Sequence, residues 1–299
     1  MTEQTTHLDD PRRILLEHSD GSTSPLLVLD AARSDADLPA VLVLPGIAVG
    51  ARYYRPLARA LAAQGVPVAI TELRGQGEST HRIGRRGGAA GYHESAAEDV
   101  PLALDALERE LGARSVVLLG HSMGAQIGVY HLARHDPRVV GLVAVAAQSP
   151  FHRGFPGRMG RRLRVGAVLL PAIGWLAGHV PGAFFGAKGR VPADRIRDWS
   201  RLAARGVMQP ARADLDYPAA LAEVTVPVLS VVIAGDELAP ESAARRLLGM
   251  LPSARTTLEV EPEPLGHNTW ARNPDAIAER VLAWLRRESP GAERATTAR

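Results

Sequence analysis

The feature that constrains this chain most is the pentapeptide Gly-His-Ser-Met-Gly at residues 120–124, a G-x-S-x-G pattern. The apolar run 115–119 precedes it, and residues 125–130 continue as a helix pattern. A serine on a sharp strand-to-helix turn has a strained backbone that lifts its hydroxyl clear of the sheet. Gly120 and Gly124 leave room for this turn because neither has a side chain to collide with its neighbours. The context therefore predicts Ser122 as a nucleophile at the edge of a sheet.

Apolar runs alternate with helical patterns on both sides of this turn. The runs typical of buried strands are residues 40–44, 66–71, 115–119, 139–147, 226–233 and 256–260. The helical patterns cover residues 53–63, 93–111, 241–251 and 274–288. Two short strands at 14–16 and 26–29 predict a hairpin at the edge of the sheet. The alternation predicts an α/β fold with a mostly parallel, twisted sheet of about eight strands and helices on both faces.

The alternation stops between residues 149 and 217, where arginines surround an apolar stretch. We expect a helical cap at 149–217, inserted into a core of residues 13–148 and 218–288, and disordered tails at 1–12 and 289–299. Residues 165–187 are nearly free of charge and about long enough to span a bilayer. Prolines and glycines interrupt them, which favours a buried or lid segment over a transmembrane helix.

The composition removes several classes of function. The chain has no cysteine, so it offers no disulfide framework, no thiolate metal ligand and no cysteine nucleophile. No set of histidines or carboxylates has the spacing of a metal site, and we expect no metal and no cofactor.

The formal charge is +3, and the positive charge is carried almost wholly by arginine, since Lys188 is the only lysine. The arginines are not interleaved with aromatic residues, which argues against a nucleic-acid partner. The polar N-terminus lacks a basic and then apolar signal, so we expect a cytoplasmic protein.

A serine hydroxyl is a weak nucleophile until a base removes its proton. His267 is the best base, because it follows the last predicted strand and the loops after parallel strands meet at the edge that carries Ser122. Asp236 follows the strand ending at residue 233 and is expected to orient His267. Glu237 is the alternative carboxylate for this role. The alternative role of Asp236 is to cap the next helix. The chain order serine, aspartate, histidine matches hydrolases and neither common protease order.

Acyl transfer also needs donors for a developing oxyanion. The backbone N–H of Met123 follows the nucleophile at a helix N-terminus, where the helix dipole favours negative charge. The loop after strand 40–44 offers the backbone N–H of Ile47. We therefore predict an oxyanion hole made by the Ile47 and Met123 amides, whose side chains only line the pocket.

These residues together resemble the α/β-hydrolase superfamily over nearly the whole chain outside the tails. Residues 120–124 look like the nucleophile elbow of its lipase-like members, including monoglyceride lipases and bacterial esterases. Residues 72–79 are similar to the Asp-x-Arg-Gly-x-Gly-x-Ser stretch after the fourth strand, and Asp236 and His267 match the acid and base positions. Segment 149–217 corresponds to the cap of these proteins, and the whole is most similar to a bacterial subgroup of predicted hydrolases.

Two positions depart from the family pattern. Pro45 stands where a histidine usually precedes the glycine of the oxyanion loop, which keeps the backbone donor but removes a side chain that often braces the loop. Glu72 replaces the aspartate of the fourth-strand motif. Neither position belongs to the predicted triad.

The sequence thus predicts a serine hydrolase that cleaves carboxylic esters, including lipid-like acyl esters or thioesters, through an acyl-enzyme on Ser122. An acyltransferase with the same triad and a non-catalytic ligand-binding protein are the alternatives. The apolar cap favours a small-molecule ester with an apolar acyl chain. Its arginines suit an anionic substrate or peripheral contact with a membrane, but we favour an ordinary arginine-rich lid over both. For Arg82, Arg85 and Arg86 we favour a solvated loop over a phosphate site. The oligomeric state stays open.

Overall fold

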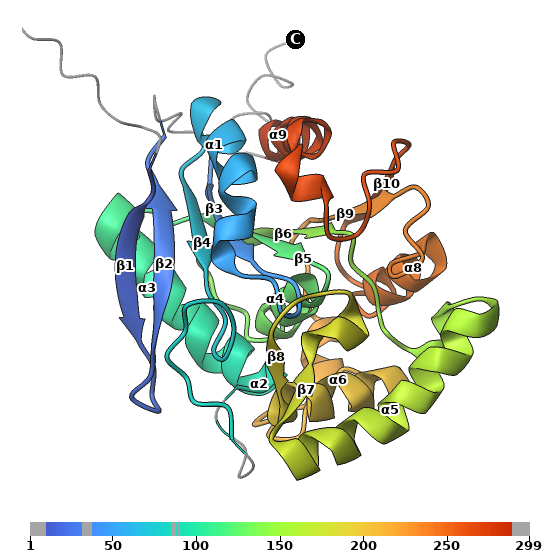
Figure 1. The fold of residues 1–299 in the computed structure, drawn as a ribbon. Coiled ribbons are helices and arrows are strands. Elements are labelled where there is room, and N and C mark those ends of the chain that lie inside the picture. Colours follow the sequence, from blue (N-terminus) through green and yellow to red (C-terminus); the bar gives the residue numbers. More distant parts are fainter. Residues whose placement is uncertain (1–9, 32–37, 85–87, 89, 289–299) are drawn as a thin grey trace, which may run out of the picture.

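The computed structural model describes residues 10–31, 38–84, 88 and 90–288. Their centre is an eight-stranded sheet in the order β1-β2-β4-β3-β5-β6-β9-β10, with helices on both faces (Figure 1). Strand β2 is antiparallel to β1 and β4, whereas the other neighbouring strands are parallel. The predicted α/β class and the mostly parallel sheet are confirmed.

The elements follow the predicted alternation closely. The strands of the large sheet are β1 Arg12–Glu17, β2 Thr23–Leu29, β3 Ala40–Leu44, β4 Val68–Thr71, β5 Val116–His121, β6 Val139–Val145, β9 Val228–Ile233 and β10 Thr256–Glu261. The helices that cover it are α1 Arg55–Ala63, α3 Val100–Leu111, α4 Met123–Leu132, α8 Glu241–Leu248 and α9 Asp275–Glu288. Before α3, the helix predicted at 93–111 has a short α2, Tyr92–Glu94, and a π-helical segment, Ser95–Asp99. Short helical turns flank α1 at Ala51–Tyr54 and α9 at Trp270–Arg272.

Alternating side chains of the central strands enter two separate cores. In β3 all five residues are buried, and Leu42 packs in the cluster that contains α3, α4 and α8, whereas Val41 packs in the cluster that contains α1 and α9. Successive side chains of a strand point to opposite faces, so a strand covered on both sides must be apolar throughout. This is why the predicted strands had continuous apolar runs.

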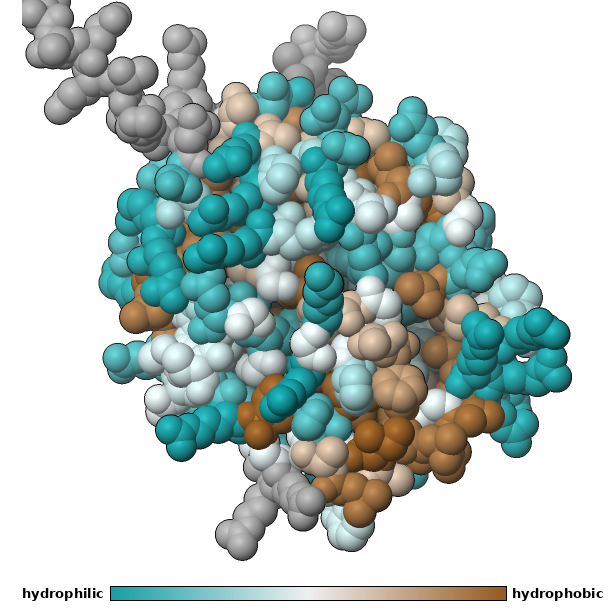
Figure 2. Space-filling view, in the orientation of Figure 1, coloured by the Kyte–Doolittle hydropathy of each residue, from teal (hydrophilic) through white to brown (hydrophobic). Residues whose placement is uncertain are grey.

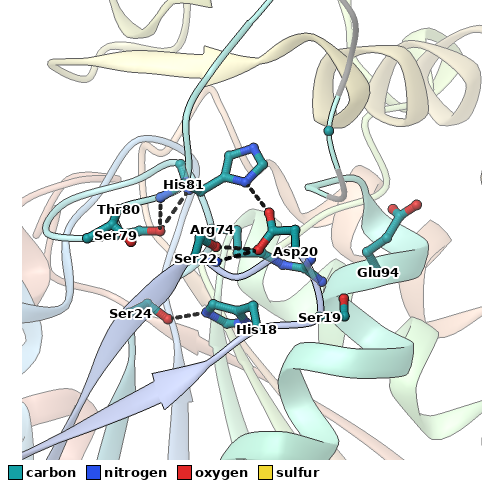
Figure 3. A network of polar contacts seen from close by, with 12 residues as sticks. His18, Ser19, Asp20, Ser22, Ser24, Arg74, Ser79, Thr80, His81 and Glu94 are labelled. Carbon is teal, nitrogen blue, oxygen red and sulfur yellow. Dashed lines mark hydrogen bonds and ion pairs between the residues drawn. The ribbon is translucent and has the colours of Figure 1, made fainter.

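The hairpin of β1 and β2 is fastened to the loop after β4 by polar contacts (Figure 3). His81 Nδ1 lies 2.6 Å from Asp20 Oδ2, and the Thr80 N–H donates to the Thr23 carbonyl at 2.8 Å. Arg82, in the same loop, is exposed, in line with the predicted solvated loop, while Arg85 and Arg86 lie outside the described residues. Residues 1–9 of the predicted tail 1–12, and the whole predicted tail 289–299, also lie outside them, and β1 begins at Arg12, where the first tail was expected to end.

Between β6 and β9 the chain leaves the sheet and forms α5 Gly157–Ala177, β7 His179–Pro181, β8 Arg190–Pro192, α6 Ala193–Arg205 and α7 Tyr217–Ala222. The antiparallel pair β7 and β8 was not predicted; it joins α5 to α6. Two buried side chains of α6 hold it on the core: Arg195 donates to the Arg74 carbonyl at 3.0 Å, and Asp198 accepts from the Tyr92 N–H at 3.0 Å. Helix α5 lies outside α6 (Figure 1). Among the described residues no helix is long and apolar enough to cross a membrane.

Candidate active site

Strand β5 passes into α4 through Ser122, whose φ of 52° and ψ of −115° are unusual for a residue with a side chain. A Cβ on Gly120 would lie 2.2 Å from Ala125 Cα, and one on Gly124 would lie 2.0 Å from the Leu44 carbonyl oxygen. Both glycines are therefore required for the close approach of strand and helix. The predicted strained turn is present, with the serine at its apex.

The three side chains predicted as a triad meet at the carboxyl edge of the sheet. Ser122 Oγ lies 3.0 Å from His267 Nε2, and His267 Nδ1 lies 2.7 Å from Asp236 Oδ2. Asp236 follows β9 and His267 follows β10, so neighbouring parallel strands deliver both to the same edge. The arrangement can pass the serine proton to the imidazole and hold the imidazolium that results.

Asp236, rather than Glu237, is the carboxylate that contacts the His267 ring. Its Oδ1 accepts the N–H groups of Leu238 at 2.9 Å and Ala239 at 3.2 Å, which leaves Oδ2 directed at His267. Glu237 is exposed. Helix α8 has Pro240 at its N-cap and no side-chain cap, so the alternative capping role of Asp236 is wrong.

The loop after β3 presents the Ile47 amide between two neighbours that already have partners. The Gly46 N–H donates to the Tyr54 hydroxyl at 2.9 Å, and the Ala48 N–H donates to Gln76 Oε1 at 2.9 Å. Met123, the other predicted donor, is the first residue of α4, directly after Ser122. Ile47 and Met123 both line the cavity above the serine, where their amides can serve an oxyanion.

Gln76 braces this loop, and sequence reasoning missed it. Its Nε2 donates to the carbonyls of Gly46 at 3.1 Å and Val49 at 3.3 Å, in addition to the bond that Oε1 accepts from Ala48. Arg195 of α6 also donates to Oε1, at 3.4 Å. The side chain that Pro45 cannot supply is thus replaced by one from the loop after β4. The only signal in the sequence was the membership of Gln76 in the 72–79 motif.

A second chain of hydrogen bonds joins the oxyanion loop to the loop of the histidine. Tyr54 Oη lies 2.7 Å from His121 Nδ1, and His121 Nε2 lies 2.9 Å from the His267 carbonyl oxygen. Burial, and secondly the nearby His267, lower the pKa of His121 well below its usual value, so the ring is neutral. Because the His267 carbonyl can only accept, Nε2 of the neutral His121 ring carries the proton and donates to it, and Nδ1 accepts from the Tyr54 hydroxyl. Both ring nitrogens of His121 are therefore engaged, by Tyr54 and by the backbone of His267.

Glu72, the other departure from the family pattern, lies beneath the same loop. It accepts the N–H groups of Ala51 at 3.2 Å and Glu78 at 3.3 Å. Burial raises the pKa of the Glu72 carboxyl to about 7. A Cβ on Gly77 would lie 1.9 Å from its Oε2, so the chain passes directly over the carboxyl group.

A cavity of about 850 Å³ opens over Ser122 and His267. The segment between β6 and β9 supplies most of its wall, with the apolar side chains Phe155, Met159, Leu163, Val165, Leu169, Leu170, Ile173, Phe184, Phe185 and Trp199. Three arginines of α5, at 158, 161 and 162, also line it. In the described part of the chain, no group of three or more histidines and carboxylates could hold a metal ion.

The sheet order, the strained serine turn and the serine–histidine–aspartate series define an α/β-hydrolase. Residues 37–270, more than half of the chain, match a family model of hydrolases described as serine aminopeptidase, S33. The protein belongs to this family. A search of the curated proteins found no match by sequence.

Several solved structures share the fold. The chain is similar to the Pyrococcus furiosus esterase PF2001, with 17% identity, 96% of each chain covered and a TM-score of 0.61. It is similar to a soluble variant of monoglyceride lipase from Saccharomyces cerevisiae, with 15% identity, 97% of each chain covered and a TM-score of 0.69. A third is the esterase EaEST from Exiguobacterium antarcticum, with 19% identity, 92% of this chain and 100% of the other covered, and a TM-score of 0.59. At these identities the likeness shows the fold alone.

Proposed function

We propose that the protein cleaves carboxylic esters of small molecules through an acyl-enzyme on Ser122. The observation that carries this proposal is the unbroken series of hydrogen-bonding distances from Ser122 Oγ through His267 to Asp236, at the base of an apolar cavity. A nucleophile, its base and the group that orients the base are the parts that acyl transfer requires.

The proposed reaction has two halves. His267 Nε2 takes the proton of Ser122 as Oγ attacks the ester carbonyl carbon, and the N–H groups of Ile47 and Met123 bind the oxygen that becomes negative. The same imidazole then gives its proton to the leaving alcohol, which leaves the acyl group on Oγ. Water repeats the sequence and releases the acid, while Asp236 holds the imidazole in the required tautomer.

The cavity favours an apolar acyl chain. We propose residues 149–217 as the cap that selects the substrate, on a core of residues 13–148 and 218–288, because the apolar walls come from α5, α6 and the turn before β8. The volume of about 850 Å³ suits a ligand of drug-like to medium-chain size. An oxygen ester and a thioester present the same carbonyl to Ser122, and both fit this proposal.

The charge of the cavity disfavours an aminopeptidase substrate, despite the name of the family. An aminopeptidase must bind a free α-ammonium group, for which a carboxylate is the natural partner. The described residues that line the cavity include three arginines and no aspartate or glutamate. A cationic terminus would therefore meet like charge, whereas an uncharged or anionic ester would not.

The experiment compares wild type with Ser122→Ala on p-nitrophenyl esters of graded chain length and on leucine p-nitroanilide. We expect ester turnover by wild type, a loss of at least about 10³-fold in the variant, and labelling of Ser122 by a fluorophosphonate probe. Full ester turnover by folded Ser122→Ala would overturn the proposal, as would preference for the anilide. Product analysis with competing alcohols or thiols separates hydrolysis from acyl transfer.

A further inference from the structure

Helix α5 has an unusual outer face. Its buried residues, Gly160, Ala167, Leu170 and Gly174, recur every three to seven positions on the side turned toward the molecule. The exposed residues of the opposite stripe recur at spacings of three and four: Arg158, Arg161, Arg162, Val165, Val168, Leu169, Ala172, Trp175 and Leu176. Residues three and four apart share one face of a helix, so this stripe is continuous.

The second half of the stripe is apolar where a surface helix is normally polar. Val168 is 69% exposed, Trp175 75% and Leu176 59%. Phe184, in the turn before β8, is 61% exposed as well. Figure 2 shows hydrophobic side chains gathered in the lower part of the molecule, where α5 lies. Single exposed apolar residues are common, but a contiguous group of large ones marks an interaction surface.

The first half of the helix is strongly basic. Arg158, Arg161, Arg162 and Arg164 lie within its first eight residues, and the helix contains no acidic residue. Within residues 10–31, 38–84, 88 and 90–288, none of these four arginines forms an ion pair. A partner for this face must therefore offer negative charge at one end and apolar surface at the other.

The stripe also borders the mouth of the cavity above Ser122. Val165 and Leu169, both 55% exposed, line the cavity, as does Phe184. The same side chains thus belong to the outer surface and to the substrate wall. A molecule seated on the stripe would cover the entrance.

We propose that the outer stripe of α5 docks on the surface of an anionic lipid bilayer. The apolar half lies at the boundary of headgroups and acyl chains, the arginines contact lipid phosphates, and the cavity opens toward the lipid. Buried apolar side chains and the attraction of arginines to anionic lipids both contribute to binding at a membrane surface. Docking gives an acyl ester a path from the membrane to Ser122. This path rests on the proposed function, whereas the docking itself does not.

The test is co-sedimentation with vesicles of phosphatidylcholine, with or without phosphatidylglycerol. We expect binding to the anionic vesicles that weakens as salt rises. The double variant Val168→Glu, Trp175→Glu should bind at least about tenfold more weakly, whereas Leu15→Glu, at an exposed apolar residue on β1 (54%), should bind as wild type does.

The arginines have their own variant and control. Replacing Arg158, Arg161 and Arg162 by glutamine should weaken binding by about fivefold each, on the order of 100-fold together. The same change at Arg114, Arg255 and Arg286, which are exposed and outside the cap, should have a much smaller effect.

Three outcomes would overturn the docking proposal: no binding by wild type, equal binding by stripe and control variants, or equal binding to vesicles with and without anionic lipid. Analytical ultracentrifugation gives a fourth, since a dimer that Trp175→Glu dissociates would show that a second copy covers the stripe.

Turnover of a water-soluble short-chain ester is measured in parallel. Because Val168 and Trp175 do not line the cavity, their variants should keep this turnover. Loss of vesicle binding with intact turnover therefore tests docking alone. Loss of turnover in Ser122→Ala with intact vesicle binding tests the proposed chemistry alone.

Discussion

Replacing Gln76 by alanine removes the brace of the oxyanion loop without touching the triad. The side chain is almost fully buried, at 4% exposure, and its loss breaks the bonds to the Ala48 N–H and to the carbonyls of Gly46 and Val49. These are the groups on either side of the Ile47 amide. The change should therefore loosen the donor that we assign to the transition state.

The magnitude follows from the bonds that remain. Complete removal of one oxyanion donor costs about 10²–10³ in kcat. The Gly46 N–H keeps its bond to Tyr54, so the loop stays attached at one end. We therefore expect Gln76→Ala to lower kcat by roughly 10- to 100-fold, equivalent to about 1.4–2.7 kcal/mol of barrier. KM should change little, because the ground-state ester gains less from the donor than the transition state does.

Gln76→Glu isolates the two donor bonds. A glutamate still accepts from Ala48 and Arg195, but it cannot donate to the two carbonyls and places a negative charge beside them. It should lose at least as much kcat as the alanine variant. The assay is saturation kinetics on a p-nitrophenyl ester, with thermal unfolding to verify the fold and Gln64→Ala, exposed after α1, as control. Folded Gln76 variants with kcat within twofold of wild type would refute the reasoning.

Three further predictions concern the surroundings of the site. Tyr54→Phe should lower the free energy of unfolding by about 1–3 kcal/mol, since the Gly46 N–H and His121 lose a buried partner; urea unfolding measures it, and an unchanged midpoint would contradict it. In wild type, the pKa of Glu72 is raised from 4.5 to about 7, so the folded state holds the proton more tightly than the unfolded state does. The free energy of unfolding should therefore fall by about 3 kcal/mol as the pH rises between these two pKa values. Glu72→Gln should abolish that slope, and an unaltered pH profile would count against it. Gly124→Ala should prevent folding or labelling of Ser122, because its Cβ meets the Leu44 carbonyl oxygen; a folded, fully labelled variant would disprove the steric argument.

The sheet and the nucleophile turn could be predicted because their signals are local. A strand buried on both faces must be apolar at successive positions, as in residues 40–44, and a strained serine turn needs glycines at fixed offsets. Chain direction then places Asp236 and His267 at the same edge as Ser122, because connections in a parallel sheet meet there. The fold class follows from these patterns without any knowledge of distances, and so does the choice of Ser122 and His267 as nucleophile and base.

The supports of the site could not be predicted in this way. Gln76, Tyr54 and His121 act through contacts between segments far apart in the chain, and no periodicity marks a glutamine that will meet three backbone groups of another loop. The β7 and β8 pair was missed because strands of three residues are too short for a pattern.

The sequence by itself determined the fold class and predicted the nucleophile, the base and the segment 149–217 as an insertion, because each depends on residue type and order along the chain. Tertiary structure alone decided which carboxylate faces His267, what holds the Ile47 amide, and which side of α5 stays uncovered. Residues 165–177 are apolar on two sides, and only the packing of α5 on α6 shows that one side is buried while the other, with Trp175, faces outward.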